Sequence, residues 1–329
     1  MGAYVIRRLL FLPATLVIVS FVTFAIARFG PGDPMSVAAG QLRDPEVLER
    51  ARAEKGLDGS IFEQYGKWAQ RALSGDFGES YSIQRGRTVR ELIMPRMWVS
   101  AQLNIIAITL VFAIGIPLGL LAAWFQGRWL DPVITSMLLG LSAVPVLVVI
   151  PPTLWLFAIK LGLLPVGGWD GVLDIYWIAG VIAIPIPDPH LYIPIAVMTI
   201  PGFAGVARLV RVTALQVQLE DYVRTARAKG LPERQVALRH VLPNSLLPVV
   251  TAIGLSLAGV LEGAFFTETL LGIPGIGSLT FAAVVSRDYD VILAVTLILA
   301  TFFIVMNLVT DLTYARVDPR VRVGASARV

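Results

Sequence analysis

Six long runs of apolar residues, separated by polar segments, dominate the pattern along this chain. A helix needs about 20 mostly apolar residues to cross the hydrocarbon core of a membrane. The runs approach that length, so we predict an all-α, polytopic membrane protein with six transmembrane helices. The predicted spans are residues 9–27, 101–125, 132–159, 191–207, 245–267 and 291–310.

Two further segments have weaker patterns. Residues 175–187 are apolar, but the segment is short and contains prolines, so we expect an interfacial or re-entrant piece rather than a seventh crossing. Residues 44–73 have helical periodicity and should form a small cap outside the membrane.

The composition agrees with a membrane protein. The chain is 56% hydrophobic and 15% charged, whereas soluble domains carry about 25% charged residues. It has no cysteine, which excludes disulfides and thiolate metal sites. The net charge of +4 does not indicate a nucleic-acid partner, because the basic residues border the apolar runs and instead report orientation in the bilayer.

Lys and Arg in the short loops predict a cytoplasmic N-terminus and a cytoplasmic C-terminus. The organisation that follows has an N-terminal transmembrane helix at 1–29 and an extracytoplasmic cap segment at 30–97. The transmembrane core follows at 98–329, with a cytoplasmic loop at 212–245 and a cytoplasmic tail at 313–329.

The 212–245 loop is polar and basic in an otherwise apolar region. Gly230 suits the left-handed position that ends a helix, Pro232 suits the first turn of the next one, and Pro243 should end or kink that second helix. We therefore predict a helix-turn-helix. The first helix has apolar residues at i, i+3, i+4 and i+7, namely Leu219, Tyr222, Val223 and Ala226.

Catalytic chemistry is not indicated. The two histidines, His190 and His240, are far apart in the sequence and make a poor triad or metal site. No lysine lies in a G-x-x-x-x-G-K-[ST] loop, so nucleotide hydrolysis by that route is excluded. The glycine-rich stretch from Gly272 to Gly277 follows an apolar run rather than a strand, which favours a tight turn or re-entrant loop.

The loop resembles the cytoplasmic loop of binding-protein-dependent ABC importer permeases, whose pattern is E-A-A, three residues, G, nine residues, I-x-L-P. Here Arg224-Thr225-Ala226, Gly230 and His240-Val241-Leu242-Pro243 stand in that spacing. Arg224-Thr225 replaces Glu-Ala, and His240 replaces Ile. Arg-Thr-Ala is the usual form in the dipeptide/oligopeptide/nickel branch, which the string DYVRTARAKGL resembles.

The resemblance covers nearly the whole chain. Of the two permeases that form a pair in this branch, one has a long first extracytoplasmic loop, and the long segment after the first predicted span is similar to that loop. Residues 167–189 are longer than the family pattern suggests. Further matching stretches are Pro31–Pro34, Gly75–Ser80, Gly115–Gly119, Glu268-Thr269, Pro274–Gly277, Arg287–Tyr289 and Asp318–Arg320.

The resemblance implies a type I ABC importer permease for di- or oligopeptides, in the inner membrane of a prokaryote, that is not itself an enzyme. It implies a second, homologous permease subunit, two cytoplasmic ATPases that hold ATP and Mg, and an extracytoplasmic solute-binding protein. No cofactor or metal is expected on this chain. The residues expected to couple to the ATPases are Leu219, Asp221, Tyr222, Val223, Arg224, Thr225, Ala226, Gly230, His240, Leu242 and Pro243.

Other readings stay open from the residues alone. The loop could lie on lipid headgroups as an amphipathic surface helix. Glu262, an acid within the fifth predicted span, is a candidate functional intramembrane group and could support an ion-driven secondary transporter. An intramembrane enzyme lacks paired catalytic groups. The substrate could be a dipeptide, a longer peptide, a glutathione-like molecule, a nickel chelate or an oligosaccharide.

Overall fold

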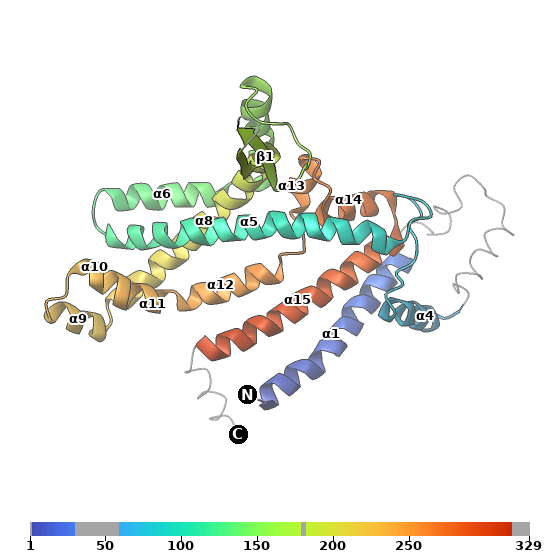
Figure 1. Cartoon of the computed structure of the whole chain (residues 1–329). Helices are drawn as coiled ribbons and strands as arrows, with labels where there is room; N and C mark the ends of the chain where they lie inside the picture. The colour runs from blue at the N-terminus through green and yellow to red at the C-terminus, as the bar shows by residue number, and fades with distance from the viewer. Residues whose placement is uncertain (1, 30–58, 179–181, 318–329) are drawn as a thin grey trace. The chain divides into compact units, whose positions relative to one another are not determined.

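The computed structural model describes residues 2–29, 59–178 and 182–317, and its architecture is mostly helical, as predicted (Figure 1). By its own internal contacts the chain forms two compact units. Unit 1 comprises Met1–Ser100, Leu261–Phe265 and Pro274–Val305, and unit 2 comprises Ala101–Val260, Phe266–Ile273 and Met306–Val329.

The helices and strands follow in chain order. The first half contains α1 (Gly2–Phe29), α4 (Ile61–Leu73), α5 (Val89–Trp124), α6 (Leu130–Ala143), α7 (Val146–Thr153), the π-helix η1 (Leu154–Lys160), β1 (Leu173–Ile178) and β2 (Ile182–Pro187). The second half contains η2 (Pro189–Leu191), α8 (Tyr192–Gln218), α9 (Asp221–Ala228), α10 (Glu233–Val236), η3 (Ala237–Val241), α11 (Leu242–Ser245), α12 (Leu247–Ala258), α13 (Phe265–Leu270), α14 (Ile276–Ser286) and α15 (Tyr289–Val317).

Three helical stretches among the described residues are long and apolar enough to cross a membrane: Val89–Trp124, Pro189–Gln218 and Tyr289–Thr313. Two bent pairs also qualify if each pair is one span, namely Asp131–Ala143 with Val146–Lys160, and Glu233–Ser245 with Leu247–Ala258. Together with the shorter apolar stretch Phe11–Ala27, these correspond to the six apolar runs of the sequence.

The third and fifth predicted spans are not single straight helices in the structure. The third bends by 92° between α6 and α7. Val144 there is extended, with ψ 122°, because the ring of the following Pro145 disfavours the helical conformation. The fifth predicted span ends early, since α12 stops at Ala258, and Gly263 has φ +75°, which a helix does not accommodate.

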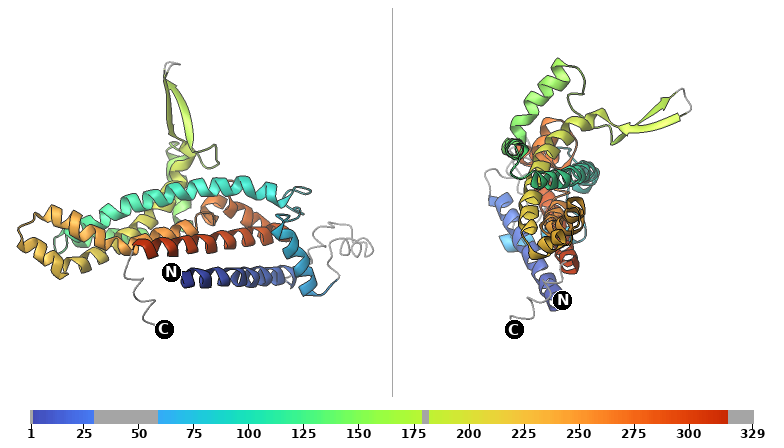
Figure 2. Two further views of the ribbon diagram at one scale, coloured as in Figure 1. Left: turned by 60° about the horizontal axis from the view of Figure 1, so that its bottom comes forward. Right: turned by 90° about the vertical axis from the view of Figure 1, so that its left-hand side faces the viewer.

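Residues 173–178 and 182–187, in the segment expected to be an interfacial or re-entrant piece, form two antiparallel strands of a hairpin. β1 pairs with β2 from Leu173 opposite Pro187 to Ile178 opposite Ile182. Pro185 and Pro187 are tolerated because a two-stranded sheet consists only of edge strands. In the right-hand view of Figure 2 the hairpin extends away from the start of α8.

In unit 2, α8 is the central helix, and it packs on α6, α7, α11 and α12. Its contact with α5 depends on the glycines of the GIPLG stretch. A Cβ at Gly119 would lie 2.4 Å from the carbonyl oxygen of Ala207, and one at Gly115 would lie 2.8 Å from Cβ of Val206. This is a small-xxx-small contact, in which the absence of side chains lets two helices approach closely.

Ion pairing fixes α6 on α8. Arg211 on α8 donates to Asp131 at the start of α6 over 2.6 Å, and both side chains are largely buried. Arg208 donates to the hydroxyl of Ser142 at the other end of α6. The direction of α8, and of the loop that follows it, is therefore set by contacts on two sides.

In unit 1, the described part of the predicted cap is α4, which packs on α1 through aromatic side chains. Phe21 stacks on Phe62 with ring centroids 5.5 Å apart, and Phe24 contacts Tyr65 and Trp68. Ser60 caps α4 reciprocally with Glu63. The rest of the predicted cap, residues 44–58, lies outside the described residues.

A buried carboxylate joins two distant motifs in unit 1. Asp288, between α14 and α15, accepts hydrogen bonds through Oδ2 from Oγ of Ser80 (2.5 Å) and from the amides of Ser82 (3.0 Å) and Ile83 (3.3 Å). Nearby, burial and the negative charge of Asp290 raise the pKa of Tyr81 well above its ordinary value, so this phenol stays protonated.

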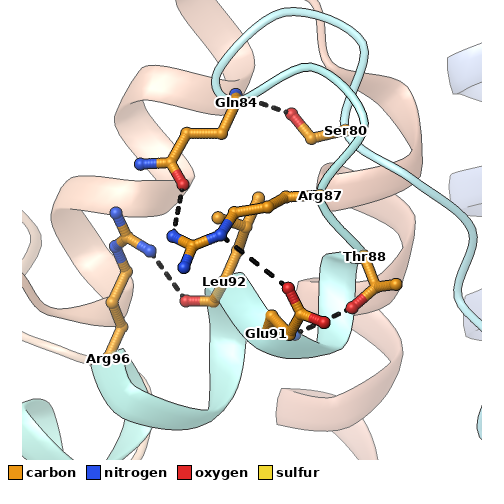
Figure 3. Close-up of polar contacts among 7 residues, drawn as sticks. All are labelled: Ser80, Gln84, Arg87, Thr88, Glu91, Leu92 and Arg96. Carbon is orange, nitrogen blue, oxygen red and sulfur yellow. Dashed lines mark hydrogen bonds and ion pairs between the residues drawn. The ribbon is translucent and has the colours of Figure 1, made fainter.

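The same loop leads into α5 through a chain of polar contacts (Figure 3). Ser80 accepts from the amide of Gln84 over 3.1 Å, and Gln84 accepts from Arg87 over 2.7 Å. Thr88 then caps α5 by accepting from the amide of Glu91 over 3.4 Å. The Gly75–Ser80 and Arg287–Tyr289 stretches thus belong to one structural element, held together by Asp288.

Replacing Gly119 with Ala should lower the apparent melting temperature of the detergent-solubilised protein. The added methyl group must push α5 from α8, and overpacking of this kind costs about 1–3 kcal/mol. Gly205→Ala on α8 is the matched control, because a Cβ there meets nothing within 4 Å. Equal melting of the two variants would show that the close contact is not needed.

Asp288→Ala should also destabilise the protein, since it leaves the hydroxyl and amides of the Ser80–Ile83 loop without their acceptor. Hydrogen bonds to a charged group contribute roughly 1.5–3 kcal/mol each. Thermal unfolding measures the loss. Asp76→Ala serves as the control, because that exposed carboxylate accepts one bond, from the amide of Gly78. A loss no larger than the control's would contradict the assignment.

Candidate functional site

The 212–245 loop is a helix-turn-helix, and its turn is made by Gly230. The amide of Gly230 donates to the carbonyl of Arg227 (2.9 Å), and that of Leu231 donates to the carbonyl of Ala226 (3.4 Å). This is the Schellman arrangement, which requires a left-handed residue after the helix. Gly230 has φ +79°, so the predicted role of this glycine is confirmed.

The second arm of the loop contains a π-helical segment, η3, directly before Pro243. Proline has no N–H to donate to the carbonyl four residues earlier, so a regular α-helix cannot continue through it unchanged. The wider π turn avoids this conflict, and the amide of Leu242 bonds to the carbonyl of Ala237. The side chain of Asn244 donates to the carbonyl of His240 over 2.8 Å. The predicted break at Pro243 is therefore a change of helix type.

The buried face of α9 contacts the loop's own second arm. Val223 and Ala226 lie in a hydrophobic cluster with Val236 and Val241 from the second arm and with Ala214 from α8. Val223 is 0% exposed and Ala226 is 5% exposed. We predicted that both would face an ATPase, but the structure uses them to attach the helix to its own chain.

Exposed residues of α9 and of the turn before it make up the other part of the predicted site. Leu219, which follows α8, is 69% exposed and Tyr222 on α9 is 43% exposed, so two large apolar side chains lie on the surface. Asp221, Arg224 and Thr225 are exposed beside them. The structure therefore divides the single apolar face of the sequence into an inner pair and an outer pair.

Charged residues brace the turn. Arg227 of α9 makes a two-pronged contact with Glu233 of α10, at 2.8 Å from Nε to Oε1 and 3.3 Å from Nη2 to Oε2. Arg224 and Asp221 form a longer, exposed pair at 3.6 Å. Exposed pairs contribute little stability, but the bidentate geometry of Arg227 fixes the angle between the arms.

The remaining predicted residues lie on the second arm. His240 and Leu242 are half-buried, and Pro243 is exposed. The arm returns to α8, where Thr213 donates to the carbonyl of Ser245 over 3.1 Å, and Ser245 is fully buried. The second arm of the loop is therefore attached to α8.

Sequence reasoning missed the residues that hold the loop in place. Ala123, Ala214, Val236 and Val241 complete the hydrophobic cluster, and Thr213 closes it. Small residues inside an apolar run give no signal of their own. Val236 and Val241 are separated by the i to i+5 spacing of a π turn, so only a reader who expected a π turn would place both on one inward face.

Glu262 does not lie within a membrane-spanning helix. It is exposed and sits in the break between α12 and α13. The prediction placed it in a continuous span, and the turn at residues 259–264 removes that context. An exposed acid in a turn does not need the charge neutralisation that a buried intramembrane acid requires.

The exposed residues of the loop form a contact surface rather than a catalytic site. Its exposed groups are apolar side chains, paired charges and a tyrosine, and none of the predicted residues forms a nucleophile–base pair. An exposed apolar strip on a helix that is braced from below is suited to contact with another protein.

Comparison with known proteins identifies the family. Residues 115–323 match the binding-protein-dependent transport system inner membrane component family, and residues 1–102 match the N-terminal part of such membrane components. The chain belongs to this family. The family assignment removes the reading as an ion-driven secondary transporter.

Curated relatives match over almost the full chain. The probable peptide ABC transporter permease y4tP of Sinorhizobium fredii is 34% identical over 98% of this chain and 100% of its own length. The dipeptide transport permease DppB of Alkalihalophilus pseudofirmus is 35% identical over 98% and 100%. The glutathione transport permease GsiC of Escherichia coli K12 is 35% identical over 97% and 98%.

A solved structure supports the same fold. The MetNI methionine ABC transporter, in an inward-facing conformation, matches with a TM-score of 0.56 at 15% identity, over 70% of this chain and 97% of that one. The type I ABC importer permease fold is thereby confirmed for this family member.

Ala226→Glu should loosen the loop, because it places a charge inside the hydrophobic cluster. Limited trypsin digestion of the permease should become at least about tenfold faster in the loop, since a buried unpaired charge is strongly unfavourable. Ala228→Glu, on the exposed side of α9, should leave digestion unchanged. The relevant cleavage sites follow Arg224, Arg227, Lys229 and Arg234.

Proposed function

We propose that this permease is half of the translocation pathway of an ATP-driven peptide importer and that its 212–245 loop docks on a cytoplasmic ATPase. The observation that best supports the proposal is the exposure of the outer pair, Leu219 and Tyr222. Leu219, at the end of α8, and Tyr222, on α9, are both exposed, and a hydrophobic cluster attaches α9 to α8 and to the second arm of the loop.

Peptides are the substrate class that the relatives favour. The similar proteins from three organisms are described as peptide, dipeptide and glutathione permeases, and glutathione is itself a small peptide. Their matches extend over nearly the whole of each chain, so the residues that line the pathway are included in the likeness.

The proposed assembly has five partners in addition to lipid. A second homologous permease completes the pathway, two ATPases bind ATP and Mg²⁺ on the cytoplasmic side, and a solute-binding protein delivers substrate from outside. A fifth partner is the peptide itself. In this arrangement both termini and the 212–245 loop are cytoplasmic, and the segment 30–97 is extracytoplasmic, as the positive charges favour.

Coupling follows from the way the loop is attached. Closure of the ATPases around ATP displaces the docked helix α9, and the cluster of Val223, Ala226 and Val236 passes that displacement to α8 without bending the loop. The α8 helix also carries the contacts with α5 and α6, so the whole unit responds. The physical form of the switch is rigid-body motion of a packed element.

Replacing Leu219 and Tyr222 together with Asp should uncouple the transporter. Docking faces tolerate buried charge poorly, so recovery of the ATPases with the permease should fall at least about tenfold. Peptide uptake should fall with it, while membrane insertion stays normal because neither residue belongs to the inner cluster. Co-purification followed by quantitative mass spectrometry measures the effect.

Leu73→Asp is the matched control, because Leu73 is a fully exposed leucine on α4, far along the chain from the loop. It should leave ATPase recovery unchanged. If the double variant recovers ATPases normally and changes only membrane-surface binding, the loop lies on lipid headgroups and the docking proposal is wrong.

A further inference from the structure

Three metal-ligating side chains converge at the base of the hairpin. Asp170 precedes β1, Asp188 follows β2, and His190 lies in η2 at the start of α8. One ligand atom from each of the three lies within 4.8 Å of the others, and no second group of this kind occurs in the part of the chain that was described. Asp170 and Asp188 lie in the 167–189 segment, which the family resemblance does not explain, and His190 follows that segment directly.

The imidazole of His190 faces both carboxylates through the same nitrogen. Its Nδ1 is 2.7 Å from Oδ1 of Asp188 and 3.6 Å from Oδ2 of Asp170. The backbone amide of His190 also donates to Oδ1 of Asp188 over 2.7 Å. Asp188 and His190 are therefore held together by two short contacts before any ligand binds, with Asp170 close beside them.

Asp188 is buried, which distinguishes this cluster from a group of exposed polar residues on the surface. Its side chain is only 2% exposed, and His190 is its sole ion-pair partner within the described ranges. Both printed side-chain contacts of Asp188, with the backbone amide and with Nδ1 of His190, are made by Oδ1, so neither of them occupies Oδ2. A buried carboxylate needs a compensating positive charge.

We propose that Asp170, Asp188 and His190 form a binding site for a divalent transition-metal cation. One imidazole nitrogen and two carboxylate oxygens are a ligand set that Zn²⁺, Ni²⁺ and related ions accept. The cation binds Nδ1 of the neutral imidazole of His190, whose single proton then resides on Nε2, so the neutral ring releases no proton. Asp170 is 72% exposed, which gives the ion a route in, and water completes its coordination.

The surrounding backbone is shaped to hold such a site. Gly168 has φ +109°, and a Cβ there would come within 3.5 Å of the His190 ring. The amide of Gly168 donates to the carbonyl of Leu271 over 2.8 Å, and the amide of Asp188 donates to the carbonyl of Val172 over 3.1 Å. A bound cation would therefore join the two ends of the hairpin to the start of α8.

The test is a Zn²⁺ titration of the full-length permease, purified in detergent without a polyhistidine tag, in competition with a fluorescent chelator. The expected result is one Zn²⁺ bound per chain. Asp188→Asn and Asp170→Asn should each weaken binding, the former at least about tenfold, a loss typical of disturbed metal sites. His190→Ala should abolish it.

His240→Ala is the matched control, because His240 is the other histidine of the chain and lies on the 212–245 loop. It should bind Zn²⁺ as the unmodified protein does. The two Asn variants keep the shape of the side chain, so they test the donors even if His190→Ala fails to fold. The proposal is overturned if both Asn variants bind one Zn²⁺ with unchanged affinity, or if the unmodified chain binds none.

Discussion

The packing of Val223 and Ala226 against Val236, Val241 and Ala214 is the contact on which the 212–245 loop depends. Without it, α9 would be a short polar helix, and helices of this length are not stable alone in water. With it, the loop becomes a continuation of α8. The exposed side chains of α9 then have a defined position relative to the rest of unit 2, which a docking surface needs.

Much of this loop could be predicted from the sequence. Gly230 and the amphipathic spacing of α9 are local signals, and the structure confirms them. The assignment of Val223 and Ala226 was wrong because periodicity shows only that a face is apolar. It does not show whether that face meets its own chain or a partner. The deciding residues, Ala214 and Val236, lie on other helices.

The membrane-spanning segments show a similar limit. Their number and order follow from apolar length, but the bends depend on individual residues such as Pro145 and Gly263. The hairpin could not be told from an interfacial segment, because a short apolar run with prolines fits both. The hydrogen bond from Ser80 to Asp288 also could not be predicted from one sequence, because the two residues are 208 positions apart.

The hairpin has a consequence for how this protein sits in its membrane. A two-stranded sheet pairs only the inner edge of each strand, and β1 and β2 have no third strand among the described residues. The polar backbone groups along the two outer edges therefore require water or protein, and hydrocarbon offers neither. Because β2 leads directly into η2 and α8, a hairpin kept outside the hydrocarbon limits how deeply the start of α8 can lie in the bilayer.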